Sequence, residues 1–113
     1  MFEFGSIVLA RFPFTDLSGE KRRPALVVSR DNERRTDIVV CFITSIARFG
    51  RDMAPIAASS ETGLKVPSVL RFDKLATLEK TVVSGKIGDA TPAWLTTNGK
   101  LFFGVFGFDP PRS

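Results

Sequence analysis

Apolar residues recur along the chain in short runs, separated by polar stretches that contain glycine or proline. The first run, SIVLARF at residues 6–12, is rich in β-branched and aromatic residues and stops at Pro13. Such a run predicts a β-strand. The same pattern predicts further strands at residues 24–29, 38–43, 69–73 and 85–88, and residues 53–58 form a short apolar piece that ends in a loop.

Two of these runs also indicate which faces are buried. Residues 38–43 are almost all apolar, which predicts a strand that is covered on both sides of its sheet. In residues 69–73 the side chains alternate, so Leu70 and Phe72 share one face while Arg71 and Asp73 share the other. This alternation is expected to bring a cation and a carboxylate together.

The C-terminal third of the chain changes to a helical period. Thr91 followed by Pro92 is typical of a helix N-cap with proline at the first helical position. Residues 94, 95, 98, 101, 102, 105 and 106 then follow a three- and four-residue spacing. This spacing predicts an amphipathic helix of about four turns that ends at Gly107. Gly99 and Gly104 each lower its intrinsic stability by about 1 kcal/mol, so packing must hold the helix.

Several short strands followed by one helix predict a mainly β protein with a C-terminal helix, folded as a small barrel. The strand pattern alone does not separate an SH3-like barrel from an OB-like one. The 113 residues contain no repeat or linker, so residues 1–113 are expected to form one domain. The lone cysteine, Cys41, lies in the run IVVCFI and is expected to be a small buried hydrophobe.

The charge balance favours a polyanionic partner. A total of 16 lysines and arginines against 12 carboxylates gives a net charge of +4 and a pI near 9.7. Such a bias attracts phosphate backbones, although a solvated basic face is the simpler explanation. The cations are grouped, however, at residues 21–23, 30–35, 48–51 and 71–74.

The absence of histidine restricts the chemistry further. It excludes histidine acid–base catalysis and Ser-His-Asp triads, and one cysteine with scattered carboxylates does not supply a zinc site. We therefore expect no metal and no cofactor. Any reaction must use Arg, Lys, Asp, Glu, Ser or Thr side chains, and phosphodiester transfer is one of the few reactions that suit this set.

No targeting or membrane segment is recognisable in the sequence. There is no basic leader followed by an apolar stretch, and no run approaches the ~18 apolar residues of a membrane helix. A cytoplasmic protein without a membrane partner is the expectation.

Four blocks of the sequence resemble the MazF/PemK family of toxins from type II toxin–antitoxin systems. They are RFPFTDLSG and KRRPALVVS within residues 5–29, FITS at 42–45, LKVPSVLRFDKL at 64–75 and KIG at 86–88. The resemblance implies an SH3-like β-barrel with a C-terminal helix, a homodimer, and a metal-independent endoribonuclease that cleaves single-stranded RNA. It also implies neutralisation by a cognate antitoxin, and an acidic, partly disordered segment would suit a basic groove.

Cleaving RNA without a metal or histidine requires the ribose 2′-hydroxyl to attack the adjacent phosphorus. The products are a 2′,3′-cyclic phosphate and a 5′-hydroxyl. The protein must remove the 2′-hydroxyl proton, stabilise the negative charge of the transition state and assist the departing 5′-oxygen. Arginine suits the second task, because its planar fork holds two phosphate oxygens and stays charged.

The resemblance assigns these tasks to particular residues. Arg23, in the Arg-Pro step, matches the catalytic arginine of the family. Thr44 and Ser45 match a pair of hydroxyls that bind the scissile phosphate. Arg71 and Asp73 match an Arg-x-Asp pair, with Asp73 the candidate base and Arg71 a phosphate clamp or proton donor. A structural ion pair explains Asp73 equally well, and a base at this position would need a raised pKa, which Arg71 opposes.

Five further residues are candidates for binding RNA. Lys21 and Arg22 lie in the loop before the Arg-Pro step, where some members of the family carry a histidine, and they supply positive charge there. Lys74 extends the basic group on the strand of residues 69–73. Phe14 and Phe49 lie near basic residues and are candidates for stacking on bases, although most of the 11 phenylalanines must belong to the core.

Two other functions remain open at this point. A related CcdB-like barrel toxin inhibits DNA gyrase and relies on an exposed tryptophan near its C-terminus. Here Trp94 lies on the predicted helix and the chain ends FDPPRS. The second is a non-catalytic RNA- or protein-binding barrel, which would not need the set of Arg23, Thr44 and the Arg-x-Asp pair.

Overall fold

A computed structural model describes residues 2–11, 22–30, 34–45 and 50–108. In these residues six strands form one antiparallel sheet with the order β4-β5-β3-β2-β1-β6. The strands are β1 (Ser6–Arg11), β2 (Arg22–Val27), β3 (Asp37–Thr44), β4 (Met53–Ile56), β5 (Ser68–Glu79) and β6 (Val83–Asp89). A 3₁₀ turn, Lys80–Val82, joins β5 to β6, and the helices α1 (Pro92–Asn98) and α2 (Lys100–Phe106) follow.

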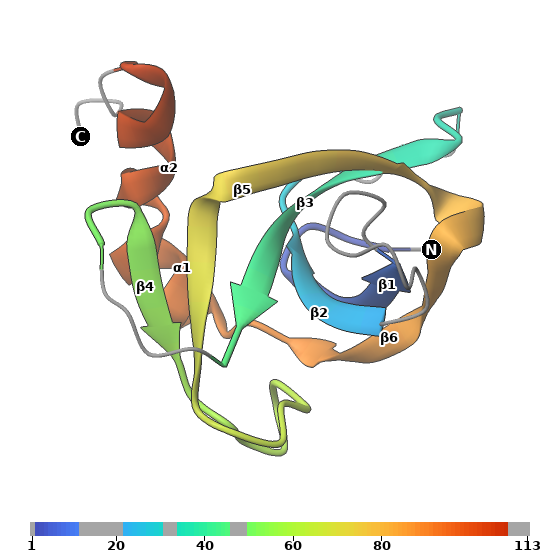
Figure 1. The fold of residues 1–113 in the computed structure, drawn as a ribbon, viewed down its shortest axis with the longest axis horizontal. Coiled ribbons are helices and arrows are strands. Elements are labelled where there is room, and N and C mark those ends of the chain that lie inside the picture. Colours follow the sequence, from blue (N-terminus) through green and yellow to red (C-terminus); the bar gives the residue numbers. More distant parts are fainter. Residues whose placement is uncertain (1, 12–21, 31–33, 46–49, 109–113) are drawn as a thin grey trace.

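The sheet curls around its own long axis, so that β1, β2, β3, β5 and β6 surround a common interior (Figure 1). Strands β4 and β6 lie at the two ends of the strand order. The barrel therefore stays open between them in the described residues. The predicted class, a mainly β protein with a C-terminal helical segment, is confirmed, and each of the five predicted strands is present. The apolar piece at residues 53–58, for which no strand was predicted, contains β4.

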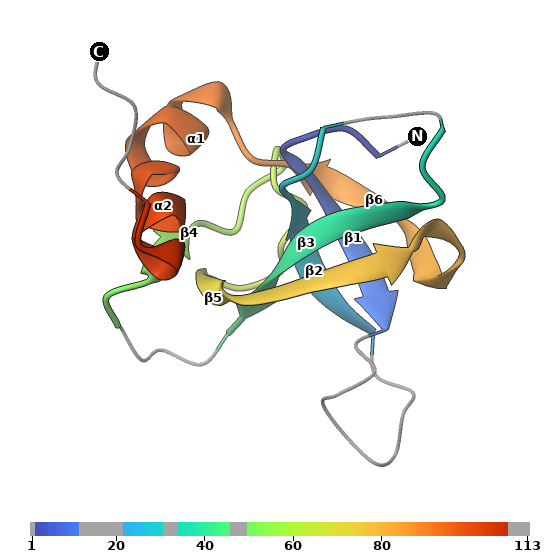
Figure 2. The same cartoon turned by 90° about the horizontal axis from the view of Figure 1, so that it is seen from above.

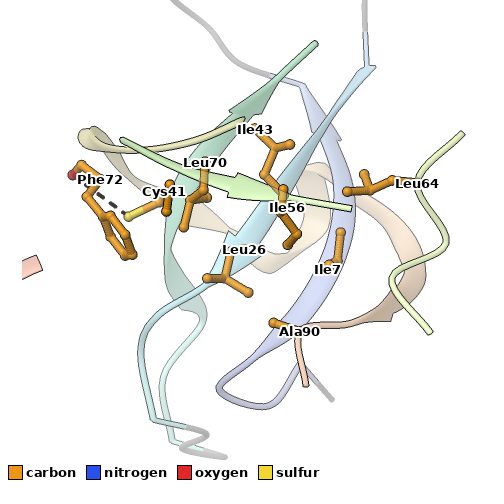
Figure 3. Close-up of a cluster of buried hydrophobic side chains, with 10 residues drawn as sticks. Ile7, Leu26, Cys41, Ile43, Ile56, Leu64, Leu70, Phe72 and Ala90 are labelled. Atoms are coloured by element: carbon orange, nitrogen blue, oxygen red, sulfur yellow. Dashed lines mark hydrogen bonds between the residues drawn. The ribbon is translucent and has the colours of Figure 1, made fainter. Parts of the chain in front are cut away.

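Both faces of the sheet are buried, because successive residues of the central strands belong to two different clusters. One cluster contains Ile7, Leu26 and Cys41 (Figure 3). The other contains their neighbours Val8 and Val27, and it runs on through other residues of β2 and β3. The continuous apolarity of β3 is thus explained, and its predicted burial on both faces is confirmed.

Strand β5 is longer than predicted and is bulged at the point that matters for the site. Cys41 pairs with Leu75, but the next residue, Phe42, pairs with Arg71. The intervening residues 72–74 therefore have no partner on β3, and a bulge of this kind redirects side chains. Phe72 keeps the face that it shares with Leu70, as the alternation predicts, and it is 2% exposed in the same core cluster.

The helical segment begins and ends where predicted but is divided in two. The Thr91 side chain accepts a hydrogen bond from the Trp94 N–H, and Gly107 ends α2 in the left-handed region at φ 75°. Around Gly99 the backbone remains helical, yet Phe102 N–H bonds to Gly99 O, a three-residue step. The Asn98 side chain donates to Trp94 O at 3.0 Å and so competes with the backbone ladder.

The two helices lie together at one side of the sheet, beside β4 and the bulged part of β5 (Figure 2). Their inner side chains pack against the cluster that contains Ile7; these are Trp94, Leu95, Leu101, Phe102 and Val105. Within the described ranges, no helix is long and apolar enough to cross a membrane.

Candidate functional site

A groove of about 400 Å³ runs between the start of β2, the end of β3 and the segment that leads into β5. Its lining combines charged and apolar side chains. Its lining residues are Leu9, Arg22, Arg23, Pro24, Ile43, Thr44, Ser45, Gly63, Leu64, Lys65, Val66, Ser68 and Ile87.

Four of the residues singled out in the sequence line this groove: Arg22, Arg23, Thr44 and Ser45. Their proximity follows from the antiparallel pairing of β2 with β3, in which Ala25 lies opposite Phe42. Extending that register by two residues sets Arg23 level with Thr44, on the same face of the sheet. A guanidinium group and a hydroxyl group thus share one end of the groove.

The side chain of Arg23 is held against the ring of Phe42. Its Cζ atom lies 5.3 Å from the ring centroid, within the range of a cation–π contact. Arg23 Nε is buried and has no hydrogen-bond partner in the described residues, whereas the residue as a whole is partly exposed. Parts of Arg23 other than Nε are therefore accessible to solvent.

Lys74 approaches the same ring from the bulge of β5. Its Nζ atom lies 5.8 Å from the Phe42 centroid. Because Phe42 pairs with Ala25 on one side and Arg71 on the other, this ring lies between the two strands that carry the predicted cations. Lys74 and Arg71 do not line the groove itself but adjoin it through Phe42.

Arg71 and Asp73 form the ion pair that the strand alternation predicts. Arg71 Nη2 lies 2.6 Å from Asp73 Oδ2, and Nε donates to Oδ1 at 3.1 Å, so the contact is bidentate. The hydrogen bonds from Arg71 hold the pKa of Asp73 below its usual range, despite partial burial that acts in the opposite direction. The same contact raises the pKa of Arg71.

This pairing bears on the chemistry expected of Asp73. A carboxylate whose pKa is lowered is fully ionised near neutral pH but accepts a proton weakly. The shift is opposite to the one that a strong general base requires. The pair is better suited to fix the direction of the Arg71 guanidinium group than to abstract a proton.

The opposite wall of the groove is formed by the loop that precedes β5. Thr62 is buried there, and its hydroxyl donates to Ala57 O at 2.8 Å and accepts from Ser59 N at 3.1 Å. Gly63, at φ +70°, packs directly on the backbone of β6, and Gly88 packs on the backbone of the loop in return. The loop is thereby fixed in place, and it carries Lys65 to the groove.

Lys65 and the apolar lining residues were not singled out from the sequence. Lys65 lies within the third block of the resemblance, residues 64–75, which is the signal that could have found it. The apolar lining residues Leu9, Ile43 and Leu64 showed only a strand pattern. Of the predicted RNA-binding residues, Lys21, Phe14 and Phe49 lie outside the described residues.

A second hollow of about 380 Å³ lies between the helices and the sheet. It is lined mainly by aromatic and aliphatic side chains such as Phe4, Leu26 and Phe103, with Lys100 at its edge. In the part of the chain that the structure describes, no group of three His, Cys, Asp or Glu residues is arranged to hold a metal ion.

A family model matches residues 3–96, and its description reads "PemK-like, MazF-like toxin of type II toxin-antitoxin system". The matched range contains both walls of the groove and the Arg71–Asp73 pair. None of the curated proteins compared with the chain matches it.

Several solved structures share the fold. An endoribonuclease from a mycobacterial species, in complex with its cognate antitoxin, has a TM-score of 0.78 at 22% identity, covering 98% of this chain and 99% of that chain. The Mycobacterium tuberculosis toxin MazF-mt6 has the same TM-score and identity, with 93% and 99% covered. A MazE–MazF structure from Deinococcus radiodurans has a TM-score of 0.73 at 22% identity, with 95% and 96% covered.

Proposed function

The chain belongs to the PemK-like, MazF-like toxin family of type II toxin–antitoxin systems, and on that basis we propose that it is a metal-independent endoribonuclease that cleaves single-stranded RNA. The substrate ribose supplies the 2′-hydroxyl nucleophile. The bond from phosphorus to the 5′-oxygen breaks as the 2′-oxygen bonds to phosphorus, while the 2′-hydroxyl gives up its proton to a base and the departing 5′-oxygen takes up a proton. The products are a 2′,3′-cyclic phosphate and a 5′-hydroxyl.

One observation carries this proposal: Arg23 and Thr44 stand level with each other at one end of a groove whose other wall carries Lys65. A phosphate in that position meets a guanidinium fork and a hydroxyl donor on one side and an ammonium group on the other. These groups are suited to stabilise the extra negative charge of a pentavalent phosphorus. Ser45 and Arg22 add a second hydroxyl and a second guanidinium group to the same end.

The apolar floor of the groove suits the rest of the substrate. Leu9 and Ile87, which are partly exposed, offer surface on which a base can lie, while phosphates on either side meet the cations. Arg71, oriented by Asp73, serves in this proposal as a clamp on a neighbouring phosphate or as a proton donor to the leaving oxygen. Asp73 is assigned to holding Arg71, with proton abstraction as its alternative role.

The partners follow from the same groove. We propose that a cognate antitoxin blocks it with an acidic segment, which would compete with RNA for the cations. We also propose that the toxin acts as a homodimer in the cytoplasm. One related fold was solved as an endoribonuclease with its cognate antitoxin, which supports an antitoxin as partner here.

Gyrase inhibition is the weaker candidate. The gyrase-binding barrel toxins expose a tryptophan near the C-terminus, whereas Trp94 here is partly buried and stacks against Phe72 at a centroid distance of 6.3 Å. Its indole nitrogen is also engaged, at 2.7 Å from Pro55 O. The tryptophan therefore has a structural role.

The test is to incubate the purified protein with a mixed single-stranded RNA in excess EDTA and to sequence the fragment ends. Discrete cuts with 5′-hydroxyl ends are expected, and the Arg23→Ala variant should lose them while keeping its fold. Arg35→Ala is the matched control, because Arg35 pairs with Asp37 away from the groove. Intact RNA with the wild-type protein, or equal cleavage by Arg23→Ala, would overturn the proposal.

A further inference from the structure

Two cations from different strands face one aromatic ring. Arg23 Cζ, on β2, lies 5.3 Å from the centroid of Phe42, and Lys74 Nζ, on the β5 bulge, lies 5.8 Å from it. Phe42 itself is 5% exposed. The ring is therefore a fixed part of the sheet, whereas the two cationic side chains reach solvent in part.

Holding two cations near one ring has a cost, because like charges repel and both side chains have several rotatable bonds. The face of an aromatic ring carries partial negative charge and attracts a cation within about 6 Å of its centroid. Phe42 supplies that attraction to both groups at once. Asp73, the nearby carboxylate, already binds Arg71 through both oxygens.

The register explains why one ring can serve both strands. Phe42 lies on β3 opposite Ala25 of β2 and opposite Arg71 of β5. Arg23 and Thr44 are each two residues away from this row, on the same face. The side chain at position 42 therefore lies next to Arg23 and Thr44, which the proposed reaction needs. The bulge at residues 72–74 brings Lys74 close to the same ring.

We propose that Phe42 is a positioning residue that holds two phosphate-binding cations: Arg23, which lines the groove, and Lys74, which adjoins it. The proposal rests on the proposed function, since the pair would act on the phosphates of RNA. Phe42 does not touch the substrate. It acts through the quadrupole of its ring, so an aliphatic side chain of similar bulk should fill the space without holding the cations.

The core role of Phe42 must be separated from this positioning role, because the ring also belongs to the second buried cluster. Fluorinated phenylalanines at position 42 distinguish the two roles. Successive fluorination weakens the negative potential of the ring face but leaves its shape close to that of phenylalanine. Val40→Ala is the matched control, because Val40 is buried on the same strand and face but contacts neither cation through a ring.

The experiment compares RNA cleavage by the wild type, Phe42→Leu, Val40→Ala and proteins with difluoro- and pentafluorophenylalanine at position 42. We expect kcat to fall stepwise with fluorination, and Phe42→Leu to lose about 10- to 100-fold in kcat while KM changes less. Val40→Ala should lower thermal stability but leave kcat near that of the wild type. A kcat that is unchanged across the fluorinated series would overturn the proposal.

A second measurement does not depend on cleavage. Nuclear magnetic resonance should show ring-current shifts for the Arg23 Hε and Lys74 Hε protons, and titration with inorganic phosphate should perturb both. In Phe42→Leu the shifts should vanish and phosphate should bind about 10-fold more weakly. If the wild type binds phosphate in this way but leaves RNA intact, the endoribonuclease proposal fails and the positioning role stands. Equal phosphate binding by Phe42→Leu would contradict the positioning role.

Discussion

The indole Nε1–H of Trp94 donates a 2.7 Å hydrogen bond to the backbone carbonyl of Pro55 and so ties α1 to β4. Strand β4 is at the edge of the sheet and pairs only with β5 in the described residues. The ring of Trp94 also stacks on Phe72, a buried residue of β5. One side chain therefore connects the helical segment to the edge strand and to the core.

Replacing Trp94 by phenylalanine should test this connection, because it keeps an aromatic ring and removes the N–H donor. The free energy of unfolding should fall by about 1 kcal/mol for the lost hydrogen bond, with a further loss from the smaller ring. Urea unfolding followed by circular dichroism measures the change. RNA cleavage well below the melting temperature should be unaffected, and a selective loss of cleavage would instead assign Trp94 to the site.

The loop wall of the groove makes a second prediction. A Cβ atom added to Gly88 would overlap the backbone of Thr62 and Glu61, and one added to Gly63 would overlap the backbone of Ile87. We expect Gly88→Ala to lower the free energy of unfolding by about 2–3 kcal/mol. Gly63→Ala should cost at least as much, because its φ of +70° also disfavours alanine.

Gly85 is the matched control on the same strand. Nothing lies within 4 Å of a Cβ atom added there, so Gly85→Ala should change the free energy of unfolding by less than about 0.5 kcal/mol. If Gly85→Ala and Gly88→Ala lower the free energy of unfolding equally, the loss comes from replacing a glycine of β6. It does not then come from the contact between Gly88 and the loop.

The strands were predictable because burial leaves a local mark on the sequence. Residues 38–43 read as apolar because both faces of β3 are covered, and the alternation at residues 69–73 correctly paired Arg71 with Asp73. The extension of β5 beyond residue 73 and its bulge left no such mark. They depend on which residue of β3 pairs with which residue of β5, and that register involves packing of Phe72 against the helices.

The candidate site was predictable only in part, for a similar reason. Arg23 and Thr44 were found through the resemblance of their blocks, and the register then set them level. Lys65 reaches the groove because two glycines allow the loop and β6 to touch, which is a contact between distant parts of the chain. Phe42 was not predicted as part of the site, because it lies in the apolar run IVVCFI. The sequence does not distinguish a ring that contacts two cations from an ordinary core phenylalanine.

Cys41 offers a test of the core itself. Burial, reinforced by the charge of Asp73, raises the pKa of its thiol to about 12, and its Sγ atom lies 4.0 Å from Phe72 O (Figure 3). The thiolate is the reactive form, so Cys41 should not react with a thiol reagent at pH 8 in the folded protein. It should react fully in urea. Rapid labelling of the folded protein would show that this part of the core opens readily.

The Arg71–Asp73 pair makes a prediction about pH. The pKa of Asp73 is lowered in the folded protein by hydrogen bonds from Arg71, so the pair stabilises the fold above the ordinary pKa of aspartate, about 3.9. That contribution is lost as the pH falls through the lowered pKa. Side-chain exposures of 28% and 33% mean that solvent screens the pair, which limits its contribution to about 1 kcal/mol or less.

Asp73→Asn should therefore lower the free energy of unfolding by a small, constant amount between pH 5 and pH 8. The difference from the wild type should shrink as the pH is lowered below about 4, because the carboxylate of the unfolded wild type then binds a proton, and it should vanish once the folded carboxylate is protonated as well. Urea unfolding of both proteins across this range measures it, with Asp37→Asn as a control for an ion pair outside the site. A difference that grows towards low pH would mean that Asp73 is stabilised in its protonated form, which is the condition that a general base with a raised pKa requires.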